Sequence, residues 1–358
     1  MKIYLSLTLL LFALAKSNAQ HRADQQQLSN SKSETFILMG DPQGYTKYQV
    51  NQPIFDLTTA WIADNLEQLN IRAVLCTGDL VEQNENIVLN RKMLDQTSAE
   101  MWKSISRSFE RLDNKVPYII SGGNHDYGFI NSENGITNFP KYFPFERNST
   151  WRHICISAFP NRNNSASIEN AAFEFKLAHW KPMLVITSEF HPRDEVLTWA
   201  KKLIENEKYK DHHVIFMTHG YLTNGKNARR IEKDNYLISP GNSGSDIWEK
   251  LIKNSKNIKL VICGHTGNGN GKFEDNVSHL VSDNVHGKKV HQIMFNVQTL
   301  GGGYEGNGGD GWLRIMEFLP NGTTLKIKTY SPLFGISPST KHLANRTEDY
   351  DQFDIELL

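Results

Sequence analysis

Cysteine is scarce in this chain. Only three occur in 358 residues, Cys76, Cys155 and Cys263, and this number excludes the disulfide framework that stabilises small secreted domains. None of the three has the spacing of a zinc or thiol-redox motif. Cys76 and Cys263 stand inside apolar runs, so we expect free thiols that pack as small apolar side chains.

An excess of charge of one sign is also missing. Lys plus Arg and Asp plus Glu each number 39, so the formal net charge is zero. This balance indicates neither nucleic acid nor an anionic membrane surface as a partner. Long hydrophobic runs are absent after the N-terminus, and we therefore expect no membrane-spanning segment there.

The N-terminus has the features of a secretory signal peptide. A short basic start, Met1-Lys2, precedes an apolar stretch from Ile3 to Ala15, and Ser17-Asn18-Ala19 supplies the small residues of a cleavage site. Residues 1–19 are therefore predicted to be removed, which makes the protein secreted or periplasmic. Residues 20–34 are rich in Gln, Ser and Asn, and we expect a flexible leader.

Five short apolar runs each end at a polar residue beside glycine. The runs cover residues 36–39, 74–77, 118–121, 214–218 and 260–263. Short runs of this kind, bounded by glycine, are typical of buried strands. The polar residues after them are Asp41, Asp79, Asn124, His219 and His265. Because ligands of open α/β sheets bind outside the carboxyl ends of strands, these side chains are predicted to share a metal site.

Strands alternate with helices along the first two thirds of the chain. Apolar spacing predicts helices over residues 54–69, 89–113 and 196–204. In the last third, residues 291–297, 312–319 and 324–330 have strand patterns joined by glycine-rich or Asn-Gly turns. We interpret them as a second, more antiparallel sheet packed on the first. One domain over residues 35–333 is expected, followed by a C-terminal extension, 334–358.

The order of these motifs resembles the calcineurin-like metallophosphoesterase family. The motifs are Asp41, Gly78-Asp79, Gly123-Asn124-His125, His219 and Gly264-His265. The segment Trp312-Leu313-Arg314 is similar to a secreted branch of that family, with Asp-x-Gln in its first motif. The resemblance implies an α/β fold, a four-layer α-β-β-α sandwich of two mixed sheets with two divalent metal ions at one edge.

The resemblance also implies a role for each residue. Asp79 would bridge both cations. Asp41 and Gln43 would bind the first cation, and Asn124, His219 and His265 would bind the second. A metal-bridging hydroxide would attack phosphorus, and His125 would be the general acid that protonates the leaving oxygen. Glu82, three residues after Asp79, would orient that imidazole.

The sequence departs from the family pattern at two positions. Gln43 stands where the family commonly has histidine, and Gly267 replaces the second histidine of the last motif. Both imidazoles would belong to the first cation, so we expect its site to be the weaker one. The candidate metals are Mn, Fe, Zn and Mg, and oxygen ligands disfavour zinc at the weaker site. Gln43 is interpreted either as a ligand or as a residue that positions one.

We conclude that the chain is a secreted, metal-dependent hydrolase of phosphoric esters. The alternative is a non-catalytic protein that binds a phosphate ligand through metal, with a degenerate first site. Residues 301–306 satisfy a Gly-x-Gly-x-x-Gly pattern but open no helix, which excludes a nucleotide fold. Tyr304 in this loop and Arg229 are candidates for contact with a small phosphorylated substrate. Monoester or diester preference and the oligomeric state stay open.

Overall fold

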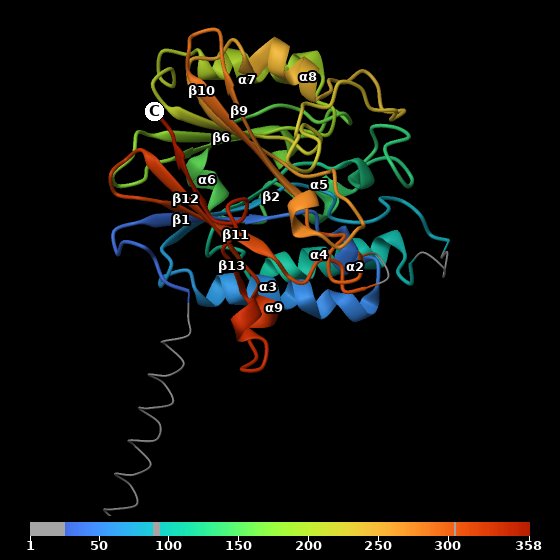
Figure 1. Ribbon diagram of the computed structural model, residues 1–358. Helices are drawn as coiled ribbons and strands as arrows, with labels where there is room; N and C mark the ends of the chain where they lie inside the picture. The colour runs from blue at the N-terminus through green and yellow to red at the C-terminus, as the bar shows by residue number, and fades with distance from the viewer. Residues whose placement is uncertain (1–25, 89–93, 304–305) are drawn as a thin grey trace, which may run out of the picture.

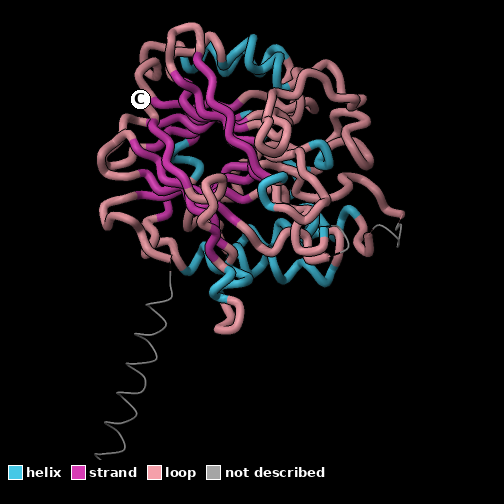
Figure 2. The backbone as a smooth tube through the Cα atoms, in the orientation of Figure 1, coloured by secondary structure: helices cyan, strands magenta, loops and turns pink. Residues whose placement is uncertain are grey.

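Two β-sheets face each other between outer layers of helices. The computed structural model describes residues 26–88, 94–303 and 306–358 (Figure 1). The helices α3 (Gln52–Asp64) and α4 (Ser98–Glu110) cover one sheet from below in Figure 1, and α7 (Asp194–Ile204) and α8 (Gly244–Ile247) cover the other from above. Figure 2 shows the strands gathered between these helices. The predicted four-layer α-β-β-α sandwich is confirmed.

The first sheet has the strand order β13-β12-β11-β1-β2-β3, and β14 also pairs with β12. Its strands are β1 (Glu34–Met39), β2 (Ile71–Cys76), β3 (Tyr118–Ile120), β11 (Leu313–Phe318), β12 (Thr324–Tyr330), β13 (Asn345–Arg346) and β14 (Phe353–Glu356). β1, β2 and β3 run parallel to one another, whereas β11 is antiparallel to both β1 and β12. The sheet is therefore mixed.

The second sheet has the order β4-β5-β6-β7-β8-β10-β9. Its strands are β4 (Cys155–Ala158), β5 (Ala171–Phe175), β6 (Met183–Thr187), β7 (His213–Met217), β8 (Ile258–Cys263), β9 (Val277–Asp283) and β10 (Lys289–Phe295). β6, β7, β8 and β10 are parallel, and the outer pairs are antiparallel. The prediction that strands of the last third form a separate sheet is wrong, because β10 joins β8 and β11 joins β1.

A local sequence signal marks the start of α4. Thr97 accepts a hydrogen bond from the main-chain N–H of Glu100, and Glu100 Oε2 accepts one from the N–H of Thr97. This capping box fixes the start of α4 at Ser98, so the helix is shorter than the predicted 89–113, of which residues 89–93 lie outside the described chain. The remaining helices are α2 (Gln43–Thr46), α5 (Phe139–Tyr142), α6 (Trp151–Ile154) and α9 (Pro332–Gly335), and a π-helical turn, Trp248–Ile252, follows α8.

Alternate residues of the second sheet face two different apolar cores. Val185 and Ile215 lie in the core shared with the first sheet. Their neighbours Leu184 and Phe216 face the helix α7, where Leu197 is buried with them. Because both faces of the parallel strands are covered, these strands are apolar along their whole length. This explains the continuous hydrophobic runs in the sequence.

Both ends of the described chain pack on the first sheet. Leu28 packs against the core between the sheets, and the main-chain N–H of Ser29 donates to Glu317 Oε1 at 2.6 Å. Residues 26–33 of the predicted leader are therefore bound to the domain. The C-terminal extension adds β13 and β14 to the sheet. The predicted signal peptide, 1–19, lies outside the described residues. Within the described residues, no helix has the length and apolarity needed to cross a bilayer.

Candidate metal centre

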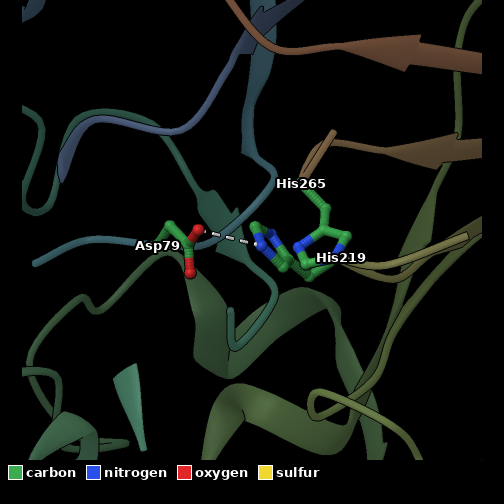
Figure 3. Close-up of side chains that lie close together, drawn as sticks. All are labelled: Asp79, His219 and His265. Carbon is green, nitrogen blue, oxygen red and sulfur yellow. Dashed lines mark ion pairs between the residues drawn. The ribbon is translucent and has the colours of Figure 1, made fainter. Parts of the chain in front are cut away.

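The five polar residues that follow predicted strands all lie at one edge of the sandwich. Asp41, Asp79 and Asn124 follow β1, β2 and β3 of the first sheet, and His219 and His265 follow β7 and β8 of the second. The carboxyl ends of both sets of parallel strands thus meet at the same edge, as expected for ligand sites of α/β sheets. Figure 3 shows Asp79, His219 and His265 side by side there.

Side chains from four of these residues converge. His219 Nε2 lies 3.0 Å from Asp79 Oδ2 and 3.0 Å from Asn124 Oδ1. His265 Nδ1 lies 2.9 Å from the same amide oxygen. The ligand atoms of Asp79, His219 and His265 all lie within 4.8 Å of one another. A carboxylate oxygen, an amide oxygen and two imidazole nitrogens at this spacing fit a divalent transition-metal ion.

Hydrogen bonds outside this group turn two of its members toward the centre. His219 Nδ1 lies 2.8 Å from the main-chain carbonyl oxygen of Thr77. A hydrogen is therefore assigned to Nδ1, and Nε2 faces Asp79 and Asn124, where a bound cation would take the place of its proton. The Asn124 amide donates through Nδ2 to Asn131 Oδ1 at 2.6 Å, which leaves Asn124 Oδ1 facing the two histidines.

Glycine is required beside the ligands because there is no room for a side chain. A Cβ on Gly123 would lie 2.2 Å from both the main-chain nitrogen and Oδ1 of Asp79. A Cβ on Gly264 would lie 2.1 Å from Asp41 Oδ1. The Gly-Asn-His and Gly-His motifs therefore keep the main chain close to the carboxylates of other strands.

Asp41 lies beside this group, where the first cation is predicted. Asp41 Oδ1 accepts a hydrogen bond from Thr77 Oγ1 at 2.6 Å, and Oδ2 accepts one from the main-chain N–H of His265 at 2.8 Å. Asp41 Oδ1 is 3.9 Å from His219 Nδ1. Gln43 Oε1 is buried and has no hydrogen-bond partner among the described residues. Such an unpaired oxygen is costly, and a cation would satisfy it.

The buried charges of the centre shift one another's pKa values. Burial raises the pKa of Asp41 to about 6, although the charge of His219 opposes this. Burial acts to raise the pKa of Asp79, but the imidazoles of His219 and His125 outweigh it and hold that pKa below its usual value. Burial acts to lower the pKa of His219, but Asp79 and Asp41 outweigh it and raise that pKa to about 10. Two buried carboxylates thus stabilise positive charge between them.

The imidazole of His125 is held at the edge of the centre by main-chain contacts. The main-chain N–H of His125 donates to Asp79 Oδ1 at 2.9 Å. The ring Nδ1 lies 2.7 Å from the main-chain carbonyl oxygen of Glu82. Glu82 therefore contacts His125 through its carbonyl group. Its carboxylate points elsewhere, and Glu82 Oε1 pairs with Lys47 Nζ at 3.3 Å. Ring Nε2 of His125 remains as the atom available to a substrate.

Only one of the two candidate substrate residues belongs to the described part of the chain. Tyr304 lies outside the described residues. Arg229 is exposed, and its main-chain N–H donates to Thr223 Oγ1 at 3.0 Å. Its contact with a phosphate stays a prediction.

Several residues that complete the centre were not predicted from the sequence. Thr77 contacts both Asp41 and His219, and its place immediately before Gly78-Asp79 was an available signal. Phe190 packs against both metal-site histidines, with ring centroids 5.9 Å from His219 and 5.8 Å from His265. Tyr236 lies 5.7 Å from His265. Phe190, Tyr236 and Asn131 come from loops, and no local pattern distinguishes them.

Comparisons with known proteins agree with this geometry. The family model for calcineurin-like phosphoesterases matches residues 34–269. A Bacillus subtilis (strain 168) protein, the uncharacterized YvnB, is 28% identical over 327 residues, which are 90% of this chain and 22% of that protein. The chain thus spans about a fifth of the length of this relative. A crystal structure of a dimetal phosphatase from Danio rerio has a TM-score of 0.50 at 10% identity, and the match covers 91% of this chain and 99% of that one.

Proposed function

Because the chain belongs to the calcineurin-like phosphoesterase family, we propose that it hydrolyses phosphoric esters at the metal centre described above. The observation that carries this proposal is the convergence of Asp79, Asn124, His219 and His265, with the imidazole of His125 fixed at their edge. The substrate is a small phosphorylated molecule.

The metal ligands are assigned from the atoms that face the centre. Asn124 Oδ1, His219 Nε2 and His265 Nδ1 would hold one divalent cation together with Asp79. Asp41 and Gln43 would hold the other, with Asp79 as the shared ligand. When bound, such a pair of Mn, Fe, Zn or Mg ions supplies an activated water and neutralises the charge of the phosphoryl oxygens.

His125 donates a proton to the leaving oxygen of the ester. Its Nδ1–H donates to the carbonyl oxygen of Glu82, so the proton that it transfers is the one on Nε2 of the protonated imidazole. The main-chain hydrogen bond from His125 to Asp79 Oδ1 holds this acid beside the proposed shared ligand. A general acid of this kind contributes roughly 10²–10⁴-fold to the rate.

The protein is proposed to act outside the cytoplasm. The support is the signal-peptide pattern of residues 1–19. The centre needs no reducing environment, because Cys76 and Cys263 are buried free thiols and no cysteine is among the proposed ligands.

The proposal is tested with paired chromogenic phosphate monoester and diester substrates in the presence of Mn²⁺. The wild type is expected to turn over at least one of them, and His125→Ala to lose roughly 10²-fold or more in kcat while it still binds Mn²⁺. His342→Ala is the control, because His342 is exposed and far along the chain; its kcat should equal that of the wild type.

Equal rates for the wild type and His125→Ala would refute the catalytic role. If neither turns over either ester with any of the four metals, the hydrolase proposal fails. The alternative, a non-catalytic binding protein with a degenerate first site, would then be preferred. Gly267, which supplies no ligand side chain, is the observation that favours this alternative.

A further inference from the structure

The segment after β10 runs alongside the segment after β8, which carries His265. In the parallel pair β8–β10, His291 lies opposite Leu260 and Met294 opposite Cys263. Beyond the strands, two side-chain hydrogen bonds join the segments. Asn296 Nδ2 donates to the carbonyl oxygen of His265 at 3.0 Å, and Thr299 Oγ1 donates to that of Asn268 at 2.8 Å. Gln298 stands between these two residues, in a turn closed by the bond from the Leu300 N–H to the Val297 carbonyl oxygen at 2.9 Å.

Gln298 has an amide oxygen without a partner. The residue is only 3% exposed, and its Oε1 is buried with no hydrogen-bond partner among the described residues. Gln43 Oε1, two residues after Asp41, is in the same condition. Buried polar groups are normally satisfied, so each of these two amide oxygens needs a partner that the described residues do not supply.

The segment that carries Gln298 also packs against the strand end that carries Asp41. A Cβ on Gly40 would lie 3.0 Å from the carbonyl oxygen of Phe295 and 3.5 Å from Cα of Asn296. A Cβ on Gly267 would lie 3.4 Å from a side-chain carbon of Thr299 and 3.8 Å from Asn296 Nδ2. The chain around Gln298 is therefore in contact both with the residue before Asp41 and with the position where the imidazole is missing.

We propose that Gln298 is a ligand of the first cation, together with Asp41, Gln43 and the shared Asp79. It replaces the histidine that the family commonly has at position 267. The inference deepens the proposed metal centre and rests on it. Neutral amide oxygens and carboxylates are hard ligands, so this site prefers Mn²⁺ or Mg²⁺ to Zn²⁺.

The test is a calorimetric titration of the metal-free protein with Mn²⁺, without substrate. The wild type is expected to show a tight and a weaker binding step. Gln298→Leu should weaken the weaker step by about 10-fold or more and leave the tight step unchanged. Gln298→Glu, which adds a charged oxygen at the same position, should strengthen the weaker step. Gln352→Leu, the same substitution at an exposed glutamine, is the matched control and should leave both steps unchanged.

Thermal unfolding separates a ligand from a structural residue. If the Gln298 amide had only a structural role, Gln298→Leu would lower the Tm of the metal-free protein. If Gln298 is a ligand, Gln298→Leu should leave the metal-free Tm unchanged or raise it, because the substitution removes a buried unpaired oxygen. Only the increase of Tm on addition of Mn²⁺ should then be smaller than in the wild type.

The assignment is overturned if both Gln298 variants bind Mn²⁺ as the wild type does, or if the wild type binds a single Mn²⁺. It is also overturned if the metal-free Tm of Gln298→Leu falls while both binding steps persist. The expected Mn²⁺ steps in a protein that hydrolyses no ester would refute the proposed function and support the ligand assignment.

Discussion

Replacing Gly123 with alanine should remove the bridging carboxylate from its position. The new Cβ would lie 2.2 Å from Asp79 N and Oδ1, whereas real Cβ contacts are essentially never shorter than 3.0 Å. Either Asp79 or the segment of Asn124 must therefore move by about 0.8 Å, the difference of these two distances. The main-chain nitrogen of Asp79 cannot swing aside as a long side chain would.

A displacement of this size is several times the roughly 0.2 Å within which metal–ligand distances are held. Since Asp79 is proposed to bridge the cations, Gly123→Ala should lose both of them. The extra methyl group should also destabilise the fold by about 1–3 kcal/mol. The loss of the cations and the loss of fold stability can be measured separately, because the lower fold stability persists in the metal-free protein.

The assay is metal analysis of the dialysed protein, together with thermal unfolding with and without Mn²⁺. Gly269→Ala is the matched control, since a Cβ there has no atom within 4 Å, and it should keep both cations. The reasoning is refuted if Gly123→Ala retains two cations with the affinity of the wild type.

Three further predictions follow from residues around and beyond the centre. Thr77→Val loses the hydroxyl that donates to Asp41 and should weaken the weaker Mn²⁺-binding step about 10- to 100-fold. Thr77→Ser keeps the hydroxyl and should bind Mn²⁺ as the wild type does. Equal titration curves of the two variants would contradict this prediction. Burial lowers the pKa of His213 from 6.5 to about 4, and the charges of Lys259 and Lys181 add to this shift. Between these two pH values the folded state binds fewer protons than the unfolded state, so the protein loses stability as the pH falls. The urea midpoint of His213→Gln should therefore fall less than that of the wild type between pH 7 and pH 4.5, and parallel curves would contradict the assignment. Two Asn-x-Ser/Thr sites, Asn148 and Asn276, are fully buried, so mass spectrometry of protein from a glycosylating host should find glycans only at the exposed sites, Asn163, Asn321 and Asn345.

The residues of the centre were predictable because each follows a strand that the local pattern reveals. The runs before Asp79 and His219 are apolar along their length since both faces of the strand are covered. Glycine beside each polar residue marks the end of the strand. Local information of this kind places a residue at the carboxyl end of a strand, and the order of the motifs identifies the family.

Which strands pair, and therefore which residues meet, was decided only by the tertiary structure. A strand pattern does not specify its partner, so the pairing of β11 with β1 and of β10 with β8 was not foreseen. The pairing of β10 with β8 brings Asn296 to the carbonyl oxygen of His265, 31 positions away in the sequence. A main-chain carbonyl is equally invisible in a sequence, because every residue has one; Glu82 contacts His125 through its carbonyl and not through its carboxylate. The sequence thus determined the chemistry available at the edge of the sandwich, and long-range pairing decided how those groups are arranged.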